Sequence, residues 1–325
     1  MNISISEAAF KLQLQDFEAA RARIESDIIV TPLLSYSTDD RKLYVKAECM
    51  QPLGSFKIRA GANAIAMADE AKLKNGIVTA SAGNFGQGVT KAAKNRGLEV
   101  HVFVPETASK LKIDSLINLG AKVTSVPFTD WWDIMMKRSA SVEGFFIHPV
   151  AELEVIIGNG VMGLEIASQF PDVDVIVVPF GGGGMVSGIA LAMKALGKSP
   201  SIVACEIESS TPLSAAKSNG SPVLVERGDS WIDGIGSTSV LTEMWPLLDV
   251  LVDEVVIVSH AEAACALRSL SDKVNLVVEG AGAVALAAAL KPKFSGKNVV
   301  AVLSGGNINQ EIHTYIMKGN DIYPF

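Results

Sequence analysis

The sequence contains little of what marks a secreted, nucleic-acid-binding or membrane-spanning protein. Its three cysteines, Cys49, Cys205 and Cys265, are odd in number and widely spaced, which favours a reducing compartment over a disulfide framework. The net charge is −7, with no basic cluster that would favour a nucleic-acid partner. No apolar run reaches the roughly 20 residues of a spanning helix, and residues 1–16 do not read as a signal peptide. We therefore expect a cytoplasmic protein that binds neither membrane nor nucleic acid.

The signature motifs of several enzyme classes are also absent. The chain has no Gly-x-x-x-x-Gly-Lys-Ser/Thr loop of P-loop ATPases and no Gly-x-Ser-x-Gly nucleophile elbow. The four histidines, His101, His148, His260 and His313, are dispersed, and none has a partner at metal-ligand spacing. We interpret each of them as a structural or surface residue and expect no metal site built on histidine.

What the sequence does contain is a repeated strand-then-helix rhythm, which predicts an α/β fold with parallel sheets. Two such series meet near residues 145–152, and 325 residues are enough for two domains. We expect strands over residues 42–48, 77–80, 99–104, 122–126, 173–179, 201–207, 250–258 and 298–303. We expect helices over residues 10–26, 57–69, 86–96, 109–119, 130–142, 152–169, 184–196, 261–271 and 280–290.

Four glycine-rich segments each follow an expected strand, where open α/β sheets bind their ligands. They are residues 81–88, 181–185, 233–236 and 304–307. The tetraglycine that begins at Gly181 precedes a helix, so its backbone N–H groups predict a phosphate site. A dinucleotide-binding reading, with Glu206 at the ribose, lacks its third glycine, which Val186 or Ser187 replaces.

One lysine lies where a turn passes into a helix. Residues 51–55 are typical of a turn, and Ser55 is typical of a helix N-cap. Lys57 should therefore lie in the first turn of the helix that follows. The positive end of the helix dipole and the nearby Arg59 both favour the neutral form of the Lys57 amine. A neutral amine is what imine formation with a carbonyl compound requires. An ordinary solvated lysine is the alternative.

In combination, these segments resemble the fold-type II pyridoxal-phosphate enzymes, and more closely their serine/threonine dehydratase and serine racemase branch. The resemblance covers residues 31–309 and rests on Ser-Phe-Lys-Ile-Arg at 55–59, Gly-Gly-Gly-Gly-Met at 181–185 and Leu-Ser-Gly-Gly-Asn at 303–307. It implies two open twisted parallel-sheet domains of the tryptophan synthase β type, with pyridoxal 5′-phosphate in the cleft between them. Residues 1–71 and 147–325 would form a large cofactor-binding domain, and residues 72–146 a small domain that grips the substrate.

The resemblance also implies a role for each matching residue. Lys57 would hold the cofactor as a Schiff base and act as the general base, with Phe56 beneath the cofactor ring. Asn84 would contact the phenolic oxygen, Gly234 the ring and Ser304 the pyridine nitrogen, and Glu279 matches an acidic position of the family. The phosphate would be held by Gly181, Gly182, Gly183, Gly184 and Met185. The substrate carboxylate would be held by the segment Ser81, Ala82, Gly83, Asn84 and Phe85.

The residue types favour one reaction over its alternatives. A neutral hydroxyl at the pyridine nitrogen makes a moderate electron sink, which favours prompt loss of a β-hydroxyl group over transamination. We therefore expect dehydration and deamination of serine, threonine or an aromatic analogue such as phenylserine to a 2-oxo acid and ammonia. Ala82 stands where serine racemases carry their second acid/base, which disfavours a racemase. An NAD-dependent dehydrogenase and a non-catalytic nucleotide-binding module remain as alternatives from other classes.

Several departures from the family pattern bear on specificity and ions. Phe85 stands where related enzymes usually carry histidine. This difference predicts a larger or aromatic substrate. The alternative is that the phenylalanine only serves packing. Residues 131–132 are both tryptophan. We interpret the pair as part of the core or of an interface, and contact with the substrate is the alternative. Glu206 matches the first ligand of a family cation site, but Ser210 and Pro212 stand at the remaining positions, so we expect no metal there. Whether the chain forms a homodimer stays open.

Overall fold

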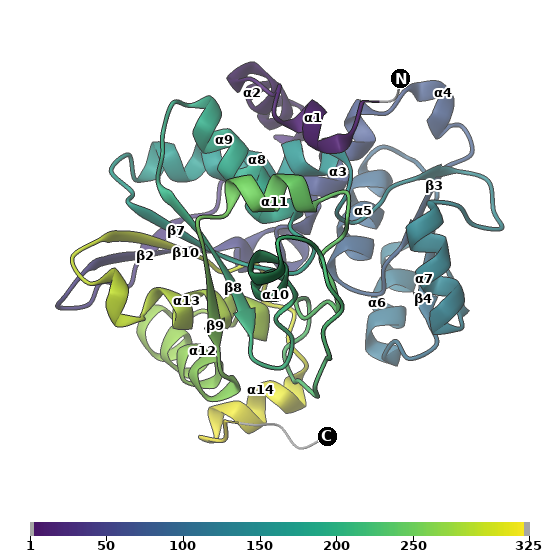
Figure 1. Ribbon diagram of the computed structural model, residues 1–325. Coiled ribbons are helices and arrows are strands. Elements are labelled where there is room, and N and C mark those ends of the chain that lie inside the picture. The colour runs from purple at the N-terminus through teal and green to yellow at the C-terminus, as the bar shows by residue number, and fades with distance from the viewer. Residues whose placement is uncertain (1–2, 322–325) are drawn as a thin grey trace.

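The larger of two β-sheets has six strands in the order β1-β2-β10-β7-β8-β9 in the computed structural model, which describes residues 3–321 (Figure 1). β1 pairs antiparallel with β2 at the edge, and the other strands are parallel. The strands are β1 Leu33–Ser35, β2 Lys42–Lys46, β7 Val175–Pro179, β8 Ser201–Ile207, β9 Glu254–Val258 and β10 Asn298–Val302.

Both faces of this sheet are covered by helices, because its central strands are apolar on both sides. Ile176 and Val178 in β7 pack with α8 and α9, whereas Val175 and Val177 pack with α12 and α13. Figure 1 shows these two helix pairs on opposite sides of the sheet. Near-continuous burial of this kind is typical of parallel strands. The helices are α8 Leu153–Gln169, α9 Gly184–Ala195, α12 His260–Val274 and α13 Gly280–Ala289.

The smaller sheet has four parallel strands in the order β5-β4-β3-β6. Leu116 of α6 packs with Val102 and Val104 on one face, and Met135 of α7 packs with Phe103 on the other. The strands are β3 Ile77–Ala80, β4 Val100–Pro105, β5 Lys122–Val126 and β6 Phe145–Phe146. Its helices are α5 Asn84–Asn95, α6 Lys110–Leu119 and α7 Phe128–Lys137.

Helix α3 (Lys57–Met67) lies at the seam between the two sheets. It packs against α5 of the small sheet and α8 of the large one, and all three contribute to one hydrophobic cluster. Glycines make the close approach possible: a Cβ at Gly158 of α8 would lie 2.5 Å from the Arg59 carbonyl oxygen. At Gly88 of α5 a Cβ would lie 2.9 Å from the backbone of Lys57. The helix that carries Lys57 is therefore clamped from both sides.

Most of the predicted elements are confirmed, and β3, β5 and β8 have the predicted bounds. The strand predicted over 250–258 is wrong in its first part, because helix α11 occupies Trp245–Leu251 and the strand begins at Glu254. The helix predicted over 10–26 is confirmed as α2 (Leu14–Ile24), which is shorter at both ends, and a separate helix, α1, precedes the predicted range. Elements that were not predicted, or that differ, are α1 Ile5–Ala9, α2 Leu14–Ile24, α4 Glu70–Leu73, α10 Pro212–Asn219, α14 Gln310–Met317 and the short helices η1 Glu48–Met50, η2 Pro52–Gly54 and η3 Pro292–Phe294.

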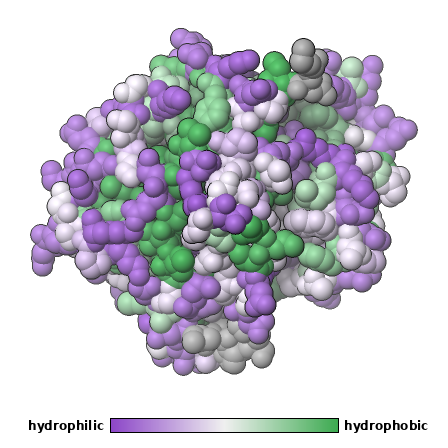
Figure 2. Space-filling model, in the orientation of Figure 1, coloured by the Kyte–Doolittle hydropathy of each residue, from purple (hydrophilic) through white to green (hydrophobic). Residues whose placement is uncertain are grey.

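The surface of the molecule carries both hydrophilic and hydrophobic side chains. Hydrophilic side chains occupy most of the rim of the face in Figure 2, and hydrophobic ones gather nearer its middle. Within residues 3–321, no helix has both the length and the apolar character that crossing a bilayer requires. Cys49, Cys205 and Cys265 are free thiols.

Candidate active site

A cavity of about 860 Å³ lies between the two sheets. Residues 81–85, 181–185 and 304 line it, and these segments follow the carboxyl ends of β3, β7 and β10, as predicted. The fourth segment, residues 233–236, also lines the cavity, but it lies in the loop between α10 and α11. The prediction that it follows a strand is therefore wrong. All the residues proposed from the resemblance for the cofactor and the substrate carboxylate line this one cavity.

Lys57 reaches into the cavity from the first turn of α3. Its Nζ atom lies 4.9 Å from the ring centroid of Phe56 and 5.7 Å from that of Phe85. The side chain is partly accessible from the cavity, but the surrounding protein separates the amine from bulk water. This burial lowers the pKa of Lys57 to about 8, against the opposing attraction of Glu279. The amine therefore loses its proton at a lower pH than an ordinary lysine does, near pH 8.

The local reasons for this low pKa differ in part from those predicted. Phe56, not Ser55, is the residue that precedes the helix, although the Ser55 Oγ accepts a hydrogen bond from the Lys57 N–H at 3.3 Å. The charge of Arg59 does not act on the lysine as expected. Its guanidinium is paired with Glu48 and Glu165, both buried, so the prediction that Arg59 favours the neutral amine is wrong.

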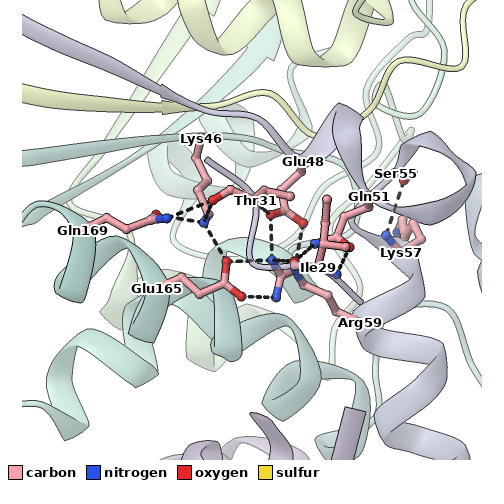
Figure 3. Close-up of polar contacts among 10 residues, drawn as sticks. All are labelled: Ile29, Thr31, Lys46, Glu48, Gln51, Ser55, Lys57, Arg59, Glu165 and Gln169. Atoms are coloured by element: carbon pink, nitrogen blue, oxygen red, sulfur yellow. Dashed lines mark hydrogen bonds and ion pairs between the residues drawn. The ribbon is translucent and has the colours of Figure 1, made fainter. Parts of the chain in front are cut away.

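These ion pairs belong to a buried network beneath the start of α3 (Figure 3). Arg59 donates to Glu48 through Nε at 2.8 Å and to Glu165 through Nη1 at 2.7 Å. Lys46 donates to Glu165 at 2.6 Å, and the Thr31 hydroxyl donates to Glu48 at 2.5 Å. Two cations thus balance two carboxylates inside the protein. The network ties α3 to β2, η1 and α8 and fixes the position from which Lys57 points.

The tetraglycine forms a cup at the N-terminus of α9. A Cβ at Gly182 would lie 2.4 Å from the side chain of Val150, and Gly183 has φ +94°, so side chains are excluded at both positions. The exposed backbone N–H groups and the helix dipole favour an anion here. Asn159 of α8 lines the same end, and its Oδ1 atom is buried without a partner among the described residues. Sequence reasoning missed Asn159, although an isolated amide in an apolar helix was a usable signal.

A polar cluster of Asn84, Glu279, Ser304 and Asn307 also lines the cavity. Asn84 donates to both carboxylate oxygens of Glu279, at 2.9 and 3.1 Å, and accepts from Asn307 at 2.8 Å. Burial is the largest effect on Glu279 and raises its pKa to about 7. The Oγ atom of Ser304 is buried and has no hydrogen-bond partner in the described part of the chain. Burying a hydroxyl group without a hydrogen-bond partner costs free energy, and a ligand that forms a hydrogen bond with it would remove this cost.

Three aromatic side chains of α7 also line the cavity. They are Phe128, Trp131 and Trp132. Trp131 packs against the core of the small sheet, as the core interpretation of the two tryptophans expects, but both tryptophans face the cavity as well. An ion pair between Lys112 of α6 and Asp233 crosses from the small-sheet side to the large-sheet side at the cavity wall.

Glu206 lies outside the cavity lining. Its carboxylate accepts hydrogen bonds from the backbone N–H groups of Leu213 and Ser214, at 2.7 and 2.9 Å, and from the Ser214 hydroxyl at 2.7 Å. It thus satisfies the N-terminus of α10, and burial raises its pKa. Across residues 3–321, no cluster of three or more His, Cys, Asp or Glu side chains is arranged to hold a metal ion.

Comparison with known proteins identifies the class to which this fold and site belong. The family model described as "Pyridoxal-phosphate dependent enzyme" matches residues 24–305. The chain belongs to this family, and its cofactor is pyridoxal 5′-phosphate. The family membership leaves the dehydrogenase and the nucleotide-binding module without support.

Individual relatives place the chain within the dehydratase and racemase branch. It is 35% identical to the L-threonine ammonia-lyase of Thermotoga maritima, covering 95% of this chain and 79% of that protein. It is also 35% identical to human serine racemase, over 93% of each chain. Among solved structures, maize serine racemase matches with a TM-score of 0.85 and 29% identity, over 94% of this chain and 97% of that one.

The residues present fit this cofactor. The side-chain-free cup at residues 181–184 suits a phosphate group, and the unpaired Ser304 hydroxyl suits a neutral contact to the pyridine nitrogen. The Lys57 amine, with its lowered pKa, suits a covalent bond to the cofactor's aldehyde. These three groups line one cavity from three different segments of the chain.

Proposed function

We propose that this protein is an ammonia-lyase that converts a β-hydroxy-α-amino acid into a 2-oxo acid and ammonia. The observation that carries the proposal is the arrangement around Lys57: a buried amine of lowered pKa faces the cavity, while Ala82, on the substrate-binding segment, can carry no proton. Two relatives support the reaction, the L-threonine ammonia-lyase of Thermotoga maritima and the L-threonine dehydratase of Staphylococcus aureus, which is 37% identical.

Each part of the site has a role in this proposal. Pyridoxal phosphate, when bound, supplies the electron sink that stabilises negative charge at the substrate Cα. Lys57 in its neutral form removes the Cα proton, and the β-hydroxyl group leaves with a proton as water, so that the proton lost from Cα balances the one gained by the hydroxyl group. The enamine that is released then takes up one water molecule and gives the 2-oxo acid and ammonia. The first backbone N–H groups of α5, after Gly83, have no partner within the helix and bind the substrate carboxylate. The polar contacts of Asn84 with Glu279 and Asn307 hold this helix end against the large sheet.

The roles of the two parts of the chain follow from these positions. Residues 1–71 and 147–325 carry the lysine, the glycine cup and Ser304, so we propose them as the cofactor-binding domain. Residues 72–146 carry the carboxylate-binding segment and form the substrate-binding domain. The three free cysteines support a cytoplasmic location. A homodimer stays a prediction that light scattering can test.

A racemase is the second candidate, because several relatives are serine racemases, including the human protein at 35% identity. Racemisation needs a proton donor on the face of Cα opposite the lysine. Ala82 cannot supply that proton, so we expect little interconversion of L- and D-amino acids.

Product analysis separates the two candidates. The cofactor-loaded protein is incubated with L-serine, L-threonine or phenylserine, and 2-oxo acid, ammonia and D-amino acid are measured together. We expect 2-oxo acid and ammonia in equal amounts with at least one substrate, and loss of both in the Lys57→Ala variant. Formation of D-serine faster than 2-oxo acid, or no 2-oxo acid from any of the substrates, would contradict the proposal.

A further inference from the structure

Three rings on α7, Phe128, Trp131 and Trp132, form a surface that we call the aromatic wall. The ring centroids of Phe128 and Trp131 lie 5.7 Å apart, and those of Trp131 and Trp132 lie 6.4 Å apart. Trp131 packs on the core of the small sheet beneath. Phe128 and Trp132 are 56% and 39% exposed, and both line the cavity. Packing of Trp131 on the small sheet therefore holds the wall in place, and Phe128 and Trp132 leave apolar surface open to the cavity.

The wall lies near the reacting end of the cavity. Helix α7 begins directly after β5, just as the carboxylate-binding segment begins directly after β3. β4 lies between these two parallel strands, and neighbouring strands are about 4.8 Å apart, so β3 and β5 are about 10 Å apart across the sheet, with β5 running two residues further than β3. On the near side, the Phe85 ring lies 5.7 Å from the Lys57 amine. One apolar ring thus lies next to the base, and three more line the same cavity.

Three of the charged groups that line the cavity already have protein partners. Lys112 and Asp233 pair with each other, and Glu279 is held by Asn84. Arg227 comes from the large-sheet side, where a Cβ at Gly236 would lie 3.8 Å from its Nε atom. Neither a methyl group nor a hydrogen on the β-carbon would cover the open rings, whereas an aromatic ring would remove their surface from water.

We propose that the substrate carries an aromatic ring on its β-carbon, so that it is a 3-aryl-3-hydroxy amino acid, and that the aromatic wall determines this specificity. The inference rests on the proposed ammonia-lyase function. It adds Phe128 and Trp132 as specificity-determining residues. Phe85 forms the near side of the same pocket.

The test compares three substrates on the cofactor-loaded enzyme: L-threonine, 3-hydroxyaspartate and phenylserine. Burial of one aromatic ring should raise kcat/KM for phenylserine at least about 10-fold over that for threonine. In the Phe128→Ala/Trp132→Ala double variant, kcat/KM for phenylserine should fall about 10-fold, while that for threonine should change less than about 2-fold. Met136→Ala is the matched control, because Met136 is an exposed apolar residue of α7 outside the cavity lining.

Binding supplies a readout that does not depend on turnover. Phenylalanine lacks the leaving hydroxyl group, so its dissociation constant can be compared with that of alanine by tryptophan fluorescence. We expect phenylalanine to bind about 10-fold tighter than alanine to the wild type and the Met136→Ala protein, and the preference to disappear in the double variant.

The possible failures are distinguishable. If threonine or 3-hydroxyaspartate is converted but phenylserine is not preferred, the specificity inference is wrong and the ammonia-lyase proposal stands. A phenylserine preference that survives in the double variant would also overturn the role of the wall. If no hydroxy amino acid yields a 2-oxo acid, the proposed function itself fails.

Discussion

The buried amine of Lys57 should make the cofactor-free protein less stable at neutral pH than at alkaline pH. The pKa falls from 10.5 to about 8 on folding, and each pKa unit corresponds to about 1.4 kcal/mol. At pH 7 the lysine is protonated in both states, so holding the charged amine away from water costs the folded protein up to about 3 kcal/mol. The cost falls as the pH rises from 8 toward 10.5, because only the unfolded chain then keeps its proton.

The Lys57→Met variant removes this cost and keeps most of the side-chain volume. Urea unfolding of both cofactor-free proteins at pH 7 and at pH 9.5 measures the difference in the free energy of unfolding. We expect Lys57→Met to raise the free energy of unfolding above that of the wild type by about 2 kcal/mol more at pH 7 than at pH 9.5. Lys110→Met, which removes an exposed lysine of α6, is the matched control for loss of one positive charge.

The result that would refute this reasoning is a Lys57→Met effect that is the same at both pH values. A constant offset would mean that the lysine titrates alike in the folded and unfolded chains. Its burial would then not prepare it to act as a neutral amine. An equal pH-dependent gain in Lys110→Met would show that net charge, not burial, is responsible.

Three further predictions concern the buried ion-pair network, the glycine cup and Glu206. Arg59→Met leaves two buried carboxylates short of a partner and should lower the free energy of unfolding by about 3–5 kcal/mol in urea titrations, unlike a change at an exposed arginine. Gly182→Val would clash with Val150 and fill the cup, so cofactor affinity, measured by absorbance titration, should fall at least about 10-fold; unchanged affinity would place the phosphate elsewhere. The Glu206 carboxylate already accepts hydrogen bonds from protein N–H and O–H groups, so removing divalent cations with EDTA should change kcat less than about 2-fold. A larger loss would contradict the expectation that Glu206 holds no metal ion.

Much of the fold could be predicted because its strands are short apolar runs between glycine-rich loops. The run at 173–179 contains β7, and the carboxyl ends of β3, β7 and β10 bring three distant segments to one cavity. Local patterns predicted that the glycine cup and Ser304 follow strands, whereas the convergence of Lys57 with them was expected only from the resemblance to the pyridoxal-phosphate enzymes. The start of β9 was misread because apolar residues of α11 run directly into it.

The parts that sequence reasoning could not supply depend on long-range partners. Arg59 has its charge balanced by Glu165, which is 106 residues away, so its effect on the lysine could not be judged locally. The two tryptophans belong to a helix whose cavity-facing side follows from the packing of α7 on the small sheet. Asn159 is one amide in an apolar helix, and only the fold shows that it points toward the cup.

The account depends most directly on the identity of the lysine that bears the cofactor. Borohydride reduction of the loaded protein, followed by proteolysis and mass spectrometry, locates the phosphopyridoxyl group on a single peptide. We predict the modification on Lys57 and none in the Lys57→Ala variant. Modification of Lys112, which also lines the cavity, or of any other lysine in its place would contradict the central claim.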